Sequence, residues 1–152
     1  MAEKGLVKSP FTISKNASGA SWVASDFATA ASWTQVLSYA VPLGTAFEIT
    51  PLNYIFGQYY GTGGVTAGDK ITAGLTRILK KNAANTESRE IFSGPNSIFK
   101  DIGDEFQRPK VRAPVVASAS QQIVVEVYSL GTTLDVSTSD FFLEGMQYYE
   151  EI

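Results

Sequence analysis

The stretch QQIVVEVY at residues 121–128 constrains the fold more than any other part of the sequence. Its residues alternate between an apolar, β-branched set and a more polar set: Ile123, Val125 and Val127 against Gln122, Val124, Glu126 and Tyr128. A period of two is typical of a β-strand that buries one face. A sheet of such strands has to cover its apolar face with a second layer, so the stretch predicts a layered β protein.

Short runs of the same kind recur along the chain between turn residues. We predict strands at residues 5–13, 33–41, 46–50, 54–60, 70–80, 89–93, 98–102, 121–128 and 141–149. Pro10 indicates that the first strand lies at a sheet edge, and Val41-Pro42-Leu43-Gly44 has the composition of a turn. Residues 16–32 and 103–119 lack a clear period and are interpreted as irregular segments, with a short helix at 26–32 as the alternative.

Eight to nine strands at this spacing favour an antiparallel β-sandwich. We predict one all-β domain over residues 1–152, an eight-stranded single jelly roll, with an immunoglobulin-like sandwich as the alternative. Residues 1–15 are interpreted as an extended N-terminal arm. The N-terminal stretch lacks the apolar segment of a secretory signal, and no apolar run has the length of a membrane span.

Gly63 and Gly68 have the spacing of the two glycines in a Walker A phosphate loop. That loop needs a lysine directly after the second glycine, but Asp69 stands there and would face the phosphates with a negative charge. The loop also has to begin a helix, whereas residues 71–79 alternate as a strand does. We therefore interpret residues 54–80 as a β-hairpin with a long loop.

The sequence contains no cysteine and no histidine. This composition excludes disulfides, thiol nucleophiles, serine–histidine relays and most zinc sites. Carboxylates, lysine and tyrosine remain as catalytic groups, but the sequence singles out no pair of acids for acid–base chemistry. We therefore predict that the protein is not an enzyme and that it uses no cofactor.

One acidic cluster is a weak candidate for a hard-cation site: Asp101, Asp104 and Glu105. Calcium needs several oxygen ligands within a short loop, and these three acids lack the alternating pattern of an EF-hand. A solvated bend is the alternative interpretation of the same residues.

The charges are divided unevenly along the chain. All 12 lysines and arginines lie in residues 1–112 together with nine acids, whereas residues 113–152 contain six acids and no base. Arg108, Lys110 and Arg112 alternate, so they would share one face of an extended segment. Because the chain has a net charge of −3, unlike most nucleic-acid-binding domains, we interpret this stripe as a contact for the acidic C-terminal region of a neighbouring copy.

Two pairs of adjacent tyrosines are candidate interface residues: Tyr59 with Tyr60, and Tyr148 with Tyr149. Neighbouring residues of a strand point to opposite faces, so one member of each pair is expected at the surface, where tyrosine often contacts a partner protein.

The exposure of Trp22 and Trp33 distinguishes a sugar-binding protein from a structural one. An exposed coplanar pair would favour sugar binding, whereas burial of both would favour a structural role.

Three stretches resemble viral jelly-roll coat and decoration proteins in their residue usage: LSYAVPLGTAFEITPLNYIFGQYYGT, NAANTES and QQIVVEVYSLGTTLDVSTSDFFLEGMQYYEE. They combine strands rich in alanine, serine, threonine and glycine with the absence of cysteine and histidine. The resemblance implies a subunit of a symmetric shell, or a cap bound to one, without catalytic residues.

We therefore expect a virion structural protein, either a capsid or a capsid-decoration subunit, that acts by self-association into a symmetric assembly. Its expected partners are other copies of itself and other virion proteins, and not nucleic acid, a membrane or a small-molecule substrate. Its expected location is the virion, after synthesis in the host cytoplasm. The alternative is a carbohydrate-binding β-sandwich module, and an enzyme that uses carboxylates is the least favoured hypothesis.

Overall fold

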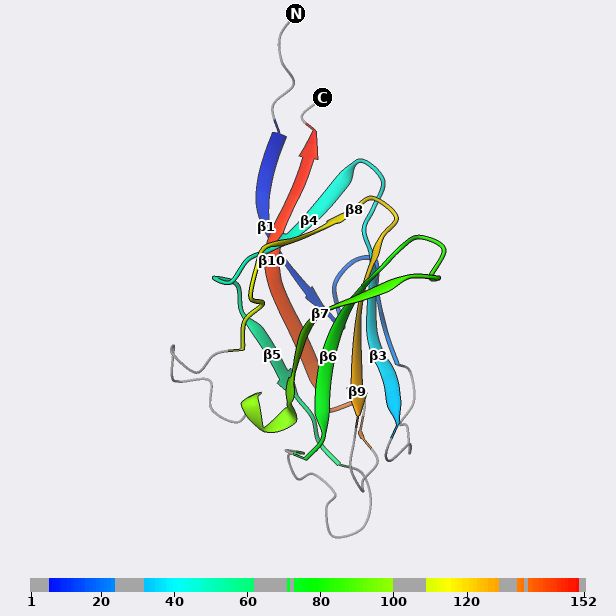
Figure 1. Cartoon of the computed structure of the whole chain (residues 1–152), viewed down its shortest axis with the longest axis vertical. Coiled ribbons are helices and arrows are strands. Elements are labelled where there is room, and N and C mark those ends of the chain that lie inside the picture. The colour runs from blue at the N-terminus through cyan, green and yellow to red at the C-terminus, as the bar shows by residue number, and fades with distance from the viewer. Residues whose placement is uncertain are drawn as a thin grey trace, which may run out of the picture.

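The computed structural model describes residues 6–23, 32–61, 71, 73–99, 109–128, 134, 135 and 137–150, which form two facing antiparallel sheets (Figure 1). Sheet A has the order β1 (Leu6–Ser14), β10 (Asp140–Glu150), β4 (Thr45–Ile49) and β8 (Val115–Ser118), and β5 (Ile55–Gln58) also pairs with β10. Sheet B has the order β2 (Ala20–Trp22), β3 (Trp33–Ala40), β9 (Gln122–Tyr128), β6 (Leu75–Lys81) and β7 (Ser88–Pro95). The predicted all-β sandwich is confirmed.

Eight of these ten strands have the connectivity of a jelly roll. They form four antiparallel pairs, taken from the ends of the chain inward: β1 with β10, β3 with β9, β4 with β8, and β6 with β7. Successive pairs alternate between sheets A and B, as they do when one long ribbon is wound around a core. The short strands β2 and β5 are additions to this ribbon. The single eight-stranded jelly roll is therefore confirmed over its immunoglobulin-like alternative.

The strand β10 runs through the middle of sheet A and changes its partner halfway. It pairs with β1 from Phe142 to Glu150, while on its other side Asp140 to Leu143 pair with β5 and Met146 to Tyr149 pair with β4. The upper ends of β1 and β10 extend beyond sheet B at one end of the molecule (Figure 1). Side chains near the end of β10 therefore have no facing sheet to cover them.

A β-bulge in β3 explains why Gln35 breaks the apolar period of this strand. The register with β9 shifts between Gln35 and Leu37. Before the shift, Trp33 is opposite Tyr128 on the outer face of sheet B; after it, Leu37 and Tyr39 are buried in the core. The extra residue of the bulge thus moves the aromatic residues of one strand to two different faces.

The core lies between the inner faces of the two sheets. Sheet A contributes Ile13, Phe47, Ile49, Ala117, Phe141 and Leu143, and sheet B contributes Leu37, Tyr39, Ile78, Ile123, Val125 and Val127. The inward alternation predicted for residues 123, 125 and 127 is confirmed. Lower in the sandwich, the ring of Phe99 packs against Phe92 and Phe141, with ring centroids 6.4 and 6.3 Å away.

The predicted hairpin over residues 54–80 is wrong. β5 belongs to sheet A and β6 to sheet B, so the chain crosses between the layers. A backbone hydrogen bond from the Ile71 N–H to the Tyr59 carbonyl (2.7 Å) joins the two flanks of the loop before they separate. Residues 62–70, which contain the two glycines, lie outside the described residues. Leu75–Lys81 is a strand, which confirms that the phosphate-loop pattern lacks its helix.

The strand predicted at residues 5–13, within the expected N-terminal arm, is confirmed as β1, because Phe11 and Ile13 pack against the core and the backbone pairs with β10. Three other segments differ from the sequence predictions. Residues 98 and 99 belong to the 3-10 helix η2 (Asn96–Phe99) and not to a strand, because the chain turns there to bury Phe99. β2 and β8 form within segments that were expected to be irregular. No helix in the described part of the chain is long and apolar enough to cross a membrane.

Candidate assembly surfaces

An apolar hollow of about 530 Å³ lies on sheet A, where β4, β8 and the end of β10 meet. We call it the tyrosine surface, and it is formed by Gly44, Thr45, Ala46, Glu48, Val116, Tyr148 and Tyr149. Tyr148 is opposite Ala46, and Val116 is opposite Glu48, so these side chains share the outer face. Two large apolar residues here stay accessible: Val116 is 42% exposed and Tyr149 is 38% exposed.

The Tyr148 ring is held in place from two sides. Its hydroxyl donates a hydrogen bond to Glu48 Oε1 at 2.6 Å. The Lys8 ammonium lies 5.0 Å from the ring centroid, within the range of a cation–π contact. The ring is therefore fixed before any partner binds, which lowers the entropy cost of using it in a contact.

The four candidate tyrosines have three different environments. Tyr148 and Tyr149 both line the tyrosine surface, as a contact role requires. Tyr60 is half-buried, and its side chain pairs with Gln58. Tyr59 is 1% exposed and packs in the core, which removes it from any surface contact. Its hydroxyl lies 3.0 Å from the Thr76 hydroxyl, and burial raises its pKa well above the ordinary value for tyrosine.

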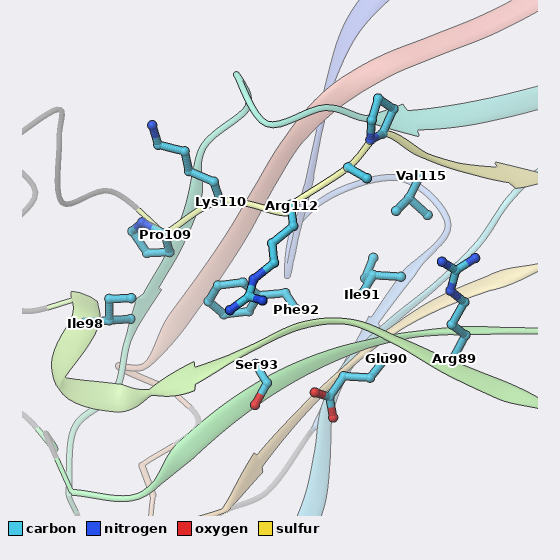
Figure 2. Close-up of a pocket in the computed structure, with 12 residues that line it drawn as sticks. Arg89, Glu90, Ile91, Phe92, Ser93, Ile98, Pro109, Lys110, Arg112 and Val115 are labelled. Atoms are coloured by element: carbon cyan, nitrogen blue, oxygen red, sulfur yellow. The ribbon is translucent and has the colours of Figure 1, made fainter.

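A second depression, of about 710 Å³, separates β7 from the segment that leads into β8 (Figure 2). We call it the basic groove; it is lined by Arg89 to Ser93, Ile98, Pro109, Lys110, Arg112 and the residues 113–115. The view shows Arg112 extending toward β7, while the Glu90 carboxylate points away from the opposite segment. The described lining of the groove thus combines three cations and the Glu90 carboxylate with apolar side chains.

The alternation predicted for the basic stripe holds for its described part. Lys110 and Arg112 are exposed on either side of the buried residue Val111. Arg108 lies outside the described residues, and so do the candidate cation ligands Asp101, Asp104 and Glu105. The sequence did not single out Arg89, Ile91 or Phe92, because only the tertiary structure places β7 opposite residues 109–115.

Two other residues at these surfaces were not recognised as candidates. Val116 lies in a segment that was predicted to be irregular because it contains prolines. Val115 and Ala117, on either side of it, face inward, and this alternation is the signal of a short strand. Leu43, next to Gly44 of the tyrosine surface, is 83% exposed in a turn. An exposed leucine in a turn carries no periodic signal, so no sequence pattern identifies it.

The two tryptophans do not form a sugar platform. Trp22 pairs with Leu37 and packs against the core on the inner face of sheet B. Trp33 lies on the outer face, where its ring contacts Tyr128 and is covered by the Arg77 guanidinium at 4.0 Å. Because the two rings are on opposite faces of one sheet, they cannot stack on the same sugar.

Asp135 lies outside these surfaces and has a shifted pKa, and its role is structural. Hydrogen bonds from Ser137 and Thr138 hold the pKa of Asp135 below its ordinary value. The Asp135 carboxylate accepts from the Ser137 hydroxyl at 2.6 Å and from its backbone N–H at 3.0 Å, which fixes the turn before β10. This arrangement is that of an Asx turn and not of an acid–base catalyst.

No protein-family model matches the sequence, and no curated protein matches it. Among the solved structures that match its fold are two of bacteriophage capsid proteins. VP17, a capsid protein of bacteriophage P23-77, aligns with a TM-score of 0.70 over 99% of this chain and 100% of its own, at 10% identity. A structure of the VP16–VP17 complex of the two major capsid proteins of the same phage aligns with a TM-score of 0.68, covering 97% of this chain and 100% of its own, also at 10% identity. This chain therefore has the jelly-roll fold found in these capsid proteins.

Proposed function

We propose that this protein is a structural, non-catalytic subunit of a virion that contacts other copies of itself and other virion proteins. The observation that supports the proposal is the end-to-end likeness of one jelly roll to VP17, with both chains covered almost completely. VP17 is a capsid protein, and the second similar structure is a complex of two major capsid proteins. A virion subunit that contacts copies of itself and other virion proteins would account for this likeness.

The tyrosine surface is the proposed contact between copies. Val116 and Tyr149 expose apolar area at the same end of sheet A, beside the ring of Tyr148. Exposed apolar area that is concentrated in one hollow favours a protein–protein contact. Tyrosine is enriched in such contacts because it buries a large ring and keeps a hydroxyl for hydrogen bonding.

Light scattering of the purified protein, over a range of concentration and salt, tests this proposal. We expect the mass to rise with concentration above the 16.4 kDa of one chain. Val116→Asp should shift the equilibrium back toward the monomer, because it places an unpaired charge in the contact. Thr12→Asp is the matched control, since Thr12 is exposed on the same sheet but outside the tyrosine surface.

The outcomes separate the parts of the proposal. A wild-type protein that keeps the monomer mass at every concentration contradicts self-association. A Val116→Asp variant that assembles like wild type shows that the copies meet elsewhere. Sugar binding in a glycan screen, combined with a strict monomer, would favour the carbohydrate-binding alternative over a virion subunit.

A further inference from the structure

The basic groove lies on the open side of the sandwich, where both sheets end. β7 is the last strand of sheet B and β8 is the last strand of sheet A. Among the described residues, no strand pairs with the outer side of either one. An edge strand directs half of its backbone N–H and C=O groups outward, and such an edge is a template for an added strand.

The hydrogen-bond pattern of β7 identifies a backbone position that faces the groove side. The Asn96 N–H donates to the Gly74 carbonyl at 2.9 Å, so this opposed pair is a bonded one. Bonded and non-bonded pairs alternate in an antiparallel ladder. Ser93, three residues earlier and opposite Arg77, therefore belongs to a non-bonded pair and turns its backbone groups away from β6.

The cations of the groove have no partner of opposite charge among the described residues. The ion pair found among the described residues joins Arg77 to Glu126, and it lies on the outer face of sheet B, away from the groove. Arg89, Lys110 and Arg112 are exposed and make neither an ion pair nor a side-chain hydrogen bond with the described part of the chain. Ile91, Phe92 and Ile98 add apolar surface beside them.

We propose that the basic groove binds an extended, acidic peptide segment of a partner protein, laid along β7 with its carboxylates on the three cations. An extended segment fits because five consecutive residues of β7, Arg89 to Ser93, form one wall of the groove. Acidic side chains fit because guanidinium groups bind carboxylates with two parallel hydrogen bonds. The inference extends the proposed function by giving the chemistry of one partner, and it involves a surface separate from the tyrosine surface.

A nucleic acid would also bring negative charge to these cations, but the structure favours a peptide. Among the described residues, three cations and the acidic Glu90 line the groove, on a chain with a net charge of −3 that repels a polyanion at long range. The apolar side chains of Ile91 and Phe92 beside the cations suit a peptide whose side chains alternate between acidic and apolar, not a phosphate backbone.

Fluorescence anisotropy with labelled synthetic peptides of about eight residues tests the proposal, since strand addition needs only a short segment. The probe alternates glutamate and valine, and the comparison peptides replace glutamate by glutamine or lysine. We expect saturable binding of the glutamate peptide that weakens as salt rises, and at least about tenfold weaker binding of the other two. Methylating every second backbone nitrogen of the probe should also weaken binding, because it removes donors to the β7 edge.

Matched variants locate the site. The double variant Arg89→Glu/Arg112→Glu should lower the affinity for the glutamate peptide by at least about tenfold. Thr12→Glu adds a negative charge at an exposed position of β1, outside both the groove and the tyrosine surface. It should leave the affinity within about twofold, because it is distant from the bound peptide.

Equal binding of the glutamate and glutamine peptides, or no saturable binding of either, would overturn the inference. Tighter binding of a single-stranded oligonucleotide than of the glutamate peptide would make the groove a polyanion site instead. None of these measurements needs the protein to assemble. The inference about the groove and the proposal about self-association can therefore fail independently.

Discussion

The ring of Phe47 lies against the backbone of Gly145, so closely that a Cβ atom added at residue 145 would come within 2.3 Å of the ring and 2.6 Å of the Glu48 carbonyl oxygen. This contact occurs where β10 changes its partner from β5 to β4. Glycine in the middle of a long strand weakens it unless another group approaches closely. Here the approaching group is a core ring, which explains the glycine.

We expect Gly145→Ala to lower the free energy of unfolding by about 3 kcal/mol, because the added methyl group forces Phe47 out of its position in the core. Urea denaturation measures the change. Gly44→Asn is the control: Gly44 has a positive φ of 77° and nothing within 4 Å of an added Cβ, and asparagine tolerates this backbone region. A Gly145→Ala midpoint equal to that of wild type would contradict the described packing.

A buried polar chain links Tyr59, Thr76 and Asn96 across the two layers. The Thr76 hydroxyl donates to Asn96 Oδ1 at 2.6 Å, so its single proton is used and the Tyr59 hydroxyl must be the donor at 3.0 Å. At pH 7, Tyr59→Phe should cost about 1 kcal/mol of stability, because the variant loses this bond.

The same residue predicts a pH dependence. Burial raises the pKa of folded Tyr59 above its unfolded value of about 10. Above that pH the unfolded chain releases the proton while the folded chain keeps it, so stability decreases as pH rises through this range. The advantage of wild type over Tyr59→Phe should therefore stay constant up to a pH of about 9 and shrink as the pH rises above about 10. A constant difference across these pH values would show that Tyr59 ionises freely in the folded state.

Arg77 joins an aromatic ring to a carboxylate on the outer face of sheet B. Its Nε donates to Glu126 Oε1 at 2.7 Å while its guanidinium covers Trp33. Lysine cannot stack as a planar group, so Arg77→Lys should cost about 1 kcal/mol and change the Trp33 fluorescence. The measurement uses a Trp22→Phe background, and Arg89→Lys serves as the control. Unchanged emission would indicate that Arg77 does not cover the ring in solution.

Two neighbouring residues distinguish an integral first strand from a detachable arm. Ile13 is 1% exposed in the core, whereas Thr12 is exposed. Ile13→Ala should cost about 2 to 5 kcal/mol through the cavity it leaves, while Thr12→Ala should stay within about 0.5 kcal/mol of wild type. Thermal unfolding measures both variants. Nearly equal melting temperatures would mean that β1 contributes little to the fold.

The path of the chain between β5 and β6 shows the limit of local patterns. Both segments alternate as strands do, and the loop between them has hairpin composition, yet they belong to different sheets. Alternation reports that one face of a strand is buried, but not which strand lies beside it. The same limit applies to η2, where the burial of Phe99 overrides the strand pattern of its neighbours.

The sequence by itself determined the all-β class, the inward residues of β9 and the positions of Lys110 and Arg112 on either side of a buried residue, because these follow from a period of two along one segment. Only the tertiary structure decided which strands are neighbours. It placed Tyr59 in the core, Tyr148 beside Val116, and Arg89 across a groove from Arg112. These relations depend on contacts between residues far apart in the chain, and such contacts are set by the packing of both sheets together.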